Sequence, residues 1–410
     1  MSLTTETPLS NSFSNYQKWI IALLAFTQFA VVLDFTVMSP MGDILMKTLN
    51  ISTKQFGFLV SSYAFSAGIS GLLTAGFADK FDRKKILLFF YFGFILGTLG
   101  CALAGNYEFL VMARIITGLF GGVIGSISLA IITDIFTLNQ RGRVIGVVQM
   151  GFSASQVLGI PVGLYFANLW GWHSAFLLLF ILGILISILI MKKMQAVDKH
   201  LLVQTNYNFL QHFRNVISQQ NYLFAFAATA LLSIGAFLIM PFGSAFAINN
   251  LQVSQNQLPL IFLYTGIASL IIMPVAGKLS DKHNKFIIFT VGSIWTMIFI
   301  WIYTNQNPIP FWLVIMLNVL LFMGIMARII PASALTSAIP RTEDRGAFMS
   351  INSSLQQISG GIASAFAGVI VYQRTSSSPL EHYPTLGYIV IFIMLICIFF
   401  MFKVSRVVVK

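Results

Sequence analysis

Charged side chains are scarce in this sequence, since Asp, Glu, Lys and Arg together make up 9% of its 410 residues. In soluble domains roughly a quarter of the residues are charged. With 57% hydrophobic residues and a mean hydropathy of +0.85, the chain is far too apolar for that class. The composition therefore predicts a membrane protein in contact with the lipid bilayer.

Several chemical signatures are also missing. The only two cysteines, Cys101 and Cys397, sit in apolar runs without the spacing of metal ligands, and we interpret them as small hydrophobic residues that hold no metal. The chain has no P-loop, no HExxH motif and no nucleophile elbow. These absences argue against an enzyme, a cofactor and transport driven by ATP, which leaves the proton gradient as the energy source.

Long apolar runs dominate what is present. Runs of ~18 to 20 apolar residues predict transmembrane helices, and we count twelve, beginning near residues 17, 53, 84, 107, 142, 172, 221, 257, 285, 309, 344 and 385. The predicted fold is all-α, with two six-helix bundles. We predict an N-terminal tail over 1–16, a first bundle over 17–195, a linker over 196–220 and a second bundle with a short tail over 221–410.

The net charge of +12 is distributed unevenly. Most of the 24 Lys and Arg residues flank the spans on one side, and only Lys47, Lys54 and Arg374 lie on the other. Cytoplasmic loops carry the excess of Lys and Arg, so we expect both termini in the cytoplasm and the chain in a plasma or bacterial inner membrane. The charge thus fits membrane topology and not nucleic acid. We expect a monomer.

One loop sequence occurs twice. Ala75 to Lys85 reads AGFADKFDRKK, and Gly277 to Lys285 reads GKLSDKHNK. In this register Asp79 corresponds to Asp281 and Arg83 to Lys285. Internal repeats indicate the architecture before local detail does, so the chain is interpreted as a duplicated six-helix unit.

The first copy of this loop resembles the signature GxxxD(R/K)xG(R/K)(R/K) between helices 2 and 3 of the major facilitator superfamily, with Ala75 and Asp82 at the two glycine positions. The resemblance implies two rocking bundles around a central cavity, with this loop as a latch. The residues it implies for gating are Gly76, Asp79, Arg83, Asp134, Asp281 and Lys285. A role of these charges in topology alone remains the alternative.

The first span contains LDFTVMSPMGDIL, which resembles the LDxTVVNVALP motif of drug:proton antiporters in that superfamily. Asp34 occupies the position of the acidic residue in this motif. An isolated carboxylate in hydrocarbon is costly, so Asp34 should face a cavity or a partner. Arg114, in a stretch that resembles the RxxxG pattern of helix 4, is within reach. We expect Asp34 to carry a proton and Arg114 to tune it; a permanent ion pair that only orients helices is the alternative. Asp43 is expected to be solvated.

The fifth span reads GIPVG where strict antiporters of the family read GPxxGG. It is closer to sugar- and nucleoside-efflux members, and we include Gly159, Pro161 and Gly163 among the gating residues. We expect polar contacts to a small-molecule substrate from Gln149, Gln156, Asn318, Arg328 and Gln357.

The resulting prediction is proton-coupled efflux of a small organic solute by alternating access. Two alternatives remain open. One is a symporter or facilitator that imports a metabolite or metal chelate, and the other is a membrane sensor that transports nothing.

Overall fold

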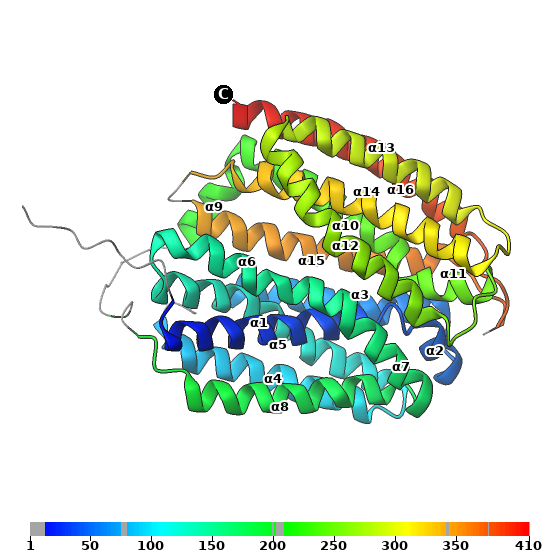
Figure 1. The fold of residues 1–410 in the computed structure, drawn as a ribbon, viewed down its shortest axis with the longest axis horizontal. Coiled ribbons are helices and arrows are strands. Elements are labelled where there is room, and N and C mark those ends of the chain that lie inside the picture. The colour runs from blue at the N-terminus through cyan, green and yellow to red at the C-terminus, as the bar shows by residue number, and fades with distance from the viewer. Residues whose placement is uncertain are drawn as a thin grey trace, which may run out of the picture.

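The computed structural model describes residues 13–74, 80–198, 201, 209–341, 344–375 and 377–409, and these form helices joined by short loops (Figure 1). Outside the helices, the described residues contain one isolated β-bridge, between Tyr372 and Glu381. Gly76 and Asp79 of the predicted latch lie outside the described residues.

The first half of the chain packs six transmembrane segments side by side. Its elements are α1 (Asn15–Val37), α2 (Gly42–Thr48), α3 (Thr53–Thr74), α4 (Arg83–Leu103), α5 (Tyr107–Ile135), α6 (Leu138–Ala154), the π-helix η2 (Ser155–Gly159), α7 (Ile160–Trp170) and α8 (His173–Lys193). Figure 1 shows α4 and α8 at the edge farthest from the second half.

The second half repeats this plan after a short helix. Its elements are α9 (Phe209–Ser218), α10 (Gln220–Ile239), the 3-10 helix η4 (Met240–Phe242), α11 (Gly243–Asn249), α12 (Leu258–Lys282), α13 (Lys285–Thr304), α14 (Phe311–Ser337), α15 (Arg345–Ile370) and α16 (Tyr383–Val409). The predicted linker therefore contains a helix, α9.

Eleven helical segments in the described residues are long and apolar enough to cross a membrane. The twelfth, α15, has 26 residues but is less apolar. It packs along α3 of the first half, and small residues line that contact: a Cβ on Gly57 would lie 2.6 Å from Ser364 O, and one on Gly68 would lie 3.0 Å from Ser354 O. Because α15 contacts protein along this face, it needs less apolar surface. The predicted all-helical fold with two six-helix bundles is confirmed.

The first transmembrane segment is broken, although the sequence predicts one continuous span from near residue 17 through LDFTVMSPMGDIL. The helix α1 ends at Val37, and α2 starts at Gly42 after a turn that contains Pro40. Proline has no N–H to donate and its ring clashes with the preceding turn. The second half shows the same break at Pro241, between α10 and α11.

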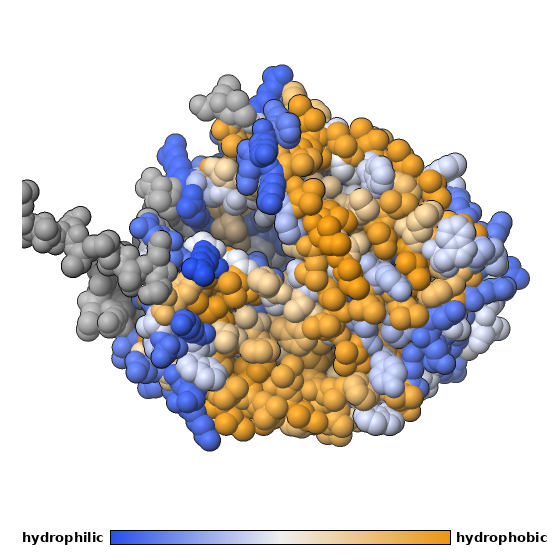
Figure 2. Space-filling view, viewed as in Figure 1, coloured by the Kyte–Doolittle hydropathy of each residue, from blue (hydrophilic) through white to orange (hydrophobic). Residues whose placement is uncertain are grey.

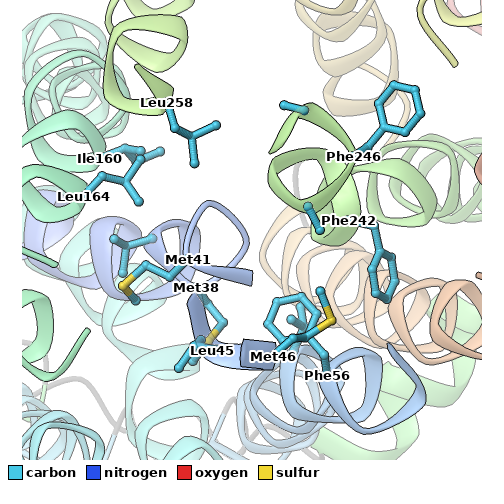
Figure 3. Close-up of a cluster of buried hydrophobic side chains, with 14 of the residues drawn as sticks. Met38, Met41, Leu45, Met46, Phe56, Ile160, Leu164, Phe242, Phe246 and Leu258 are labelled. Atoms are coloured by element: carbon cyan, nitrogen blue, oxygen red, sulfur yellow. The ribbon is translucent and has the colours of Figure 1, made fainter. Parts of the chain in front are cut away.

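Buried apolar side chains seal one end of the molecule. We call the end that carries the N-terminus of α4 and the C-termini of α8, α12 and α16 the basic end, and the end that carries α2 and α11 the closed end (Figure 1). At the closed end one cluster joins both halves, with Met38, Met41 and Phe56 from the first half and Phe242 and Phe246 from the second (Figure 3). Two further clusters flank the basic end, and the buried side chains of each come from one half alone. The halves therefore share one buried core at the closed end, whereas toward the basic end each half has its own buried core, and Leu72 of α3 packs on the edge of that of the second half.

Candidate functional site

An ion pair lies inside the first half. Arg114 Nη1 is 2.7 Å from Asp34 Oδ2 and 3.3 Å from the Asp34 carbonyl oxygen. Thr98 Oγ1 lies 3.1 Å from the other carboxylate oxygen, Asp34 Oδ1. The Asp34 and Arg114 side chains are 0% and 1% exposed. Asp34 thus faces a partner and is closed off from water in this conformation.

Aromatic rings connect this ion pair to the second half. The Arg114 guanidinium lies 4.5 Å from the centre of the Tyr63 ring, and the Tyr63 ring centre is 5.1 Å from that of Phe35. Phe35 in turn contacts Phe237 of α10, with ring centres 5.6 Å apart. A movement of α10 would therefore change the packing next to the ion pair.

Close helix packing positions these side chains. A Cβ on Gly118 would overlap Ser66 and Tyr63 of α3, and a Cβ on Gly97 of α4 would lie 2.7 Å from the backbone nitrogen of Thr117. Glycine at both sites lets α5 approach α3 and α4 closely. Arg114 lies one turn before Gly118 on α5, so this packing brings it to Asp34.

A second polar cluster joins the two halves at the closed end. Lys47 Nζ is 2.8 Å from Asp43 Oδ2 on α2, and Asn249 of α11 donates its Nδ2 hydrogen to Asp43 Oδ1 at 2.6 Å. Lys47 Nζ also donates to Asn249 Oδ1 at 3.3 Å. We call Asp43, Lys47 and Asn249 the closed-end latch. The expectation that Asp43 is solvated is wrong, because its side chain is 1% exposed against α11.

The sequence contains only part of the signal for this latch. Asp43 and Lys47 stand four residues apart, a spacing that pairs opposite charges on one helix face. Nothing in the sequence indicates that Asn249 approaches them. Three more hydrogen bonds join the halves here: Ser244 Oγ donates to Ser39 O at 2.9 Å, Thr53 Oγ1 to Val371 O at 2.6 Å and Asn168 Nδ2 to Gln255 O at 3.0 Å.

The residues predicted to contact substrate are not in one cluster. Gln149 on α6 is exposed, whereas Gln156 in η2 and Gln357 on α15 are half-buried. Asn318 donates to Val314 O of its own helix at 2.9 Å, and its side chain lies beside the Tyr303 side chain of α13. These contacts turn Asn318 toward α13.

Arg328 is buried among helices of the second half in this conformation, and its predicted contact with substrate stays a prediction. It is 4% exposed, and its guanidinium lies 5.7 Å from the Phe289 ring centre of α13 and contacts Cys397 of α16. Its Nε and Nη2 atoms have no hydrogen-bond partner among the described residues. Arg328 faces α13 and α16 because it is on the same side of α14 as Gly324, which packs on α13.

The predicted gating residues are distributed over several contacts. Arg83 Nε is 3.1 Å from Asp134 Oδ2 at the basic end, so that contact is present. Asp281 is exposed and Lys285 half-buried at the same end. Gly159 and Gly163 pack on α1, where a Cβ would lie 2.7 Å from Leu33 and 3.1 Å from Val37, respectively. Pro161 lies in the first turn of α7, directly after the π-helix. Their part in gating stays a prediction.

The contact between α12 and the fifth segment is uneven. The helix α12 packs on η2 and α7 but hardly on α6. A Cβ on Gly266 would lie 2.8 Å from Val157 in η2, and Ser153 Oγ lies 3.5 Å from Met273 Sδ. Toward the basic end Met150, Val275 and Leu279 are exposed. Figure 2 shows the molecule hollowed between the halves on this side.

The family model for the Major Facilitator Superfamily matches residues 24–206 and 225–409. The chain is 26% identical over 284 residues to the uncharacterized MFS-type transporter YtbD of Bacillus subtilis (strain 168). This alignment covers 67% of this chain and 70% of the relative. It is 22% identical over 281 residues to a probable sugar efflux transporter of Helicobacter pylori (strain ATCC 700392 / 26695), covering 68% and 71% of the two chains.

Among solved structures, the fold is similar to that of a bacterial homolog of the human lysosomal transporter Spinster. The TM-score is 0.78 at 15% sequence identity, and the match covers 97% of this chain and 99% of the other. Family and fold agree over nearly the whole length. The chain belongs to the major facilitator superfamily and is a membrane transporter, not an enzyme.

Proposed function

We propose that this transporter exports a small polar organic solute in exchange for protons, with Asp34 as the proton carrier. The observation that carries the proposal is the buried Asp34–Arg114 ion pair, which is in contact with the second half through Tyr63, Phe35 and Phe237. Intramembrane ionisable residues mark proton and substrate pathways in transporters.

The orientation follows from charge. Lysine and arginine are enriched in cytoplasmic loops, so we assign the basic end to the cytoplasm. The structure is then an inward-facing state, closed on the outside by the apolar cluster and the closed-end latch. The Spinster homolog with the similar fold was solved in an inward-facing conformation, which supports this assignment.

The coupling step uses the rocking of two halves around a central site. Opening of the closed end pulls Phe237 away from Phe35 and loosens the packing on Tyr63 and Arg114. Water then reaches Asp34, whose carboxylate takes a proton and releases Arg114. During the return to the inward-facing state the Asp34 carboxyl gives its proton to water on the cytoplasmic side before Arg114 re-forms the buried pair, so inward proton movement accompanies outward solute movement.

The proposed substrate class is sugars and related polyols or nucleosides. The support is the name of the Helicobacter pylori relative, a probable sugar efflux transporter, together with two half-buried amides near the contact between the halves. Gln156 lies in η2, which packs on α12 of the second half, and Gln357 lies on α15, which packs on α3 of the first half. One proton crossing 100 mV supplies ~2.3 kcal/mol and each pH unit adds ~1.4 kcal/mol, enough for a roughly hundredfold solute gradient.

The test is proton and solute flux in proteoliposomes. We would challenge wild type, Asp34→Asn and the control Glu108→Gln with pooled sugars and nucleosides, organic anions and cationic drugs. Glu108 is an exposed carboxylate on the same helix as Arg114. We expect a sugar or nucleoside pool to drive protons in the opposite direction in wild type and in Glu108→Gln, and Asp34→Asn to retain binding and lose proton flux.

Other outcomes overturn parts of the proposal. Solute flux without proton movement would make the protein a facilitator, and flux of both in one direction would make it a symporter. An unimpaired Asp34→Asn would reduce the ion pair to a structural role. Flux of the organic anion or cationic drug pools alone would exclude the proposed substrate class.

A further inference from the structure

An apolar groove runs between α4 and α8, on the face of the first half that is farthest from the second half (Figure 1). Its volume is about 320 Å³, and its lining residues are Leu88, Phe89, Phe92, Ile184, Ser187, Ile188 and Met191. Phe89, Phe92 and Met191 are 63%, 54% and 53% exposed. In a membrane-spanning bundle such a face contacts lipid, so the groove is open to hydrocarbon chains.

One polar side chain in the groove has no partner. Ser187 is 5% exposed, and its Oγ atom has no hydrogen-bond partner in the part of the chain that the structure describes. A buried hydroxyl without a partner costs free energy. A hydrocarbon tail offers no acceptor to this hydroxyl, but an ester carbonyl does.

Two lysines stand at the basic end of the groove. Lys85 lies three, four and seven residues before Leu88, Phe89 and Phe92, so it shares their face of α4. Lys192 follows Met191 and is four residues beyond Ile188, on the groove side of α8. Both lysines are exposed. Lys84 is not available in the same way, because its Nζ donates to the carbonyls of Met191 and Met194 and ties the two helices together.

The vertical spacing of these groups fits one class of molecule. Lys192 lies five residues beyond Ser187, which is ~7.5 Å along a helix at 1.5 Å per residue. Lysine side chains near a helix end reach outward to the membrane interface. From the basic end inward, the groove therefore presents two cations, then a hydroxyl donor, then an apolar wall. Glycerophospholipids present an anionic phosphate, ester carbonyls and acyl chains in the same order.

We propose that this groove is a binding site for one anionic glycerophospholipid. Its phosphate lies between Lys85 and Lys192, an ester carbonyl accepts the Ser187 hydroxyl hydrogen, and an acyl chain packs on Phe89 and Phe92. The helix α4 packs on α5, which carries Arg114, and α8 packs on α1, which carries Asp34. A lipid bound between α4 and α8 would therefore stabilise the helix packing around the ion pair. The site is separate from the solute pathway between the halves.

The test is native mass spectrometry of the full chain in detergent with added phosphatidylglycerol, phosphatidylcholine of the same acyl chains, or an ether-linked phosphatidylglycerol. The variants are Lys85→Gln with Lys192→Gln, Ser187→Ala, and Leu88→Trp, which fills the groove and keeps both lysines. Lys278→Gln with Lys282→Gln removes two basic-end lysines from the second half and serves as the matched control. Thermal unfolding of each variant checks its fold.

We expect wild type and the control to retain one phosphatidylglycerol more tightly than phosphatidylcholine. Each lysine near the anionic headgroup is expected to contribute about fivefold in affinity, so the Lys85 and Lys192 double variant loses the preference for phosphatidylglycerol. Leu88→Trp should lose both lipids. Ser187→Ala should weaken the ester lipid and leave the ether-linked lipid unaffected, because the latter has no ester carbonyl.

Three results would overturn the inference. Equal retention of phosphatidylglycerol by the two double-lysine variants would show general charge attraction and no site. Displacement of the lipid by inorganic phosphate would show that the groove contributes nothing. Loss of the ether lipid in Ser187→Ala would remove the ester carbonyl from the assignment. Replacing Lys85 and Lys192 by arginine should preserve the binding of phosphatidylglycerol, because the positive charge at these positions is retained.

Discussion

At the scale of single residues, two arginines buried in the interior of transmembrane helices, Arg114 and Arg328, have different surroundings. Arg114 meets the Asp34 carboxylate at 2.7 Å and the Tyr63 ring at 4.5 Å. Arg328 has the Phe289 ring and the Cys397 thiol beside it. A buried charge is tolerated when it is paired and hydrogen-bonded, so Asp34 and Arg114 depend on each other for stability.

This dependence predicts a non-additive mutant cycle. Arg114→Gln leaves the Asp34 carboxylate buried without its cation, and removing one partner of a buried pair costs ~3–5 kcal/mol of unfolding free energy. Asp34→Asn combined with Arg114→Gln should cost less than the sum of the two single variants. Unfolding in detergent measures all four proteins, and a double variant equal to that sum would show that the pair is not coupled.

At the scale of helices, breaks and close contacts matter more than regular helix. The π-helix η2 precedes Pro161, which has no N–H to donate to Val157, and the N–H of Ile160 bonds back to Ser155 O. Such π-bulges are frequent at functional sites. Here η2 faces α12 of the second half at Gly266 and contacts Leu33, next to Asp34, at Gly159.

Gly118 is the contact on which the position of Arg114 depends most directly. A Cβ there would meet the Tyr63 backbone, which cannot swing aside. We expect Gly118→Ala to lower the unfolding free energy by about 1–3 kcal/mol through overpacking and to reduce proton flux by moving α5 from α3.

The control for this variant is Gly105→Ala, because a Cβ on Gly105 would meet nothing within 4 Å. Thermal unfolding and flux in proteoliposomes measure both. If Gly118→Ala were as stable and as active as Gly105→Ala, close packing of α5 on α3 would not be needed.

At the scale of the whole molecule, the two ends are unlike. The closed end combines a shared apolar cluster with the closed-end latch of Asp43, Lys47 and Asn249. Each cluster that flanks the basic end takes its buried side chains from one half, although Leu72 of α3 packs on the edge of the second-half cluster. Alternating access requires the closed end to open. The stability of the latch should therefore set the balance between the two states.

We predict that Asn249→Ala shifts this balance toward opening at the closed end. Loss of a hydrogen bond of ~1 kcal/mol changes an equilibrium about fivefold. Spin labels at Lys54→Cys and Asn256→Cys, exposed positions on the two halves at this end, report the separation by double electron–electron resonance. The long-distance population should grow.

Asn250→Ala is the matched control. Asn250 is the next residue, but its side chain bonds Leu380 O at 3.0 Å and Leu380 N at 2.8 Å, both within the second half. It should leave the distance distribution unchanged. Equal shifts in the two variants would assign the effect to general loosening of α11. They would contradict the role of the closed-end latch in holding the closed state.

The sequence by itself determined the family architecture. Long apolar runs must form helices in a bilayer because every backbone polar group needs a partner there, and the repeated basic loop at Asp79 and Asp281 indicates duplication. Asp34 and Arg114 were also predictable as a pair, since neither charge is tolerated alone in hydrocarbon.

Only the tertiary structure decided which polar residues meet across the halves. Asp43 was expected in water and Arg328 in a cavity, yet Asp43 is buried by Asn249 from 206 residues away and Arg328 faces α13 and α16. The reason is that helix rotation and crossing are set by close contacts such as Gly57 on Ser364. Residue spacing along one helix fixes which side chains share a face, but it does not fix what that face meets.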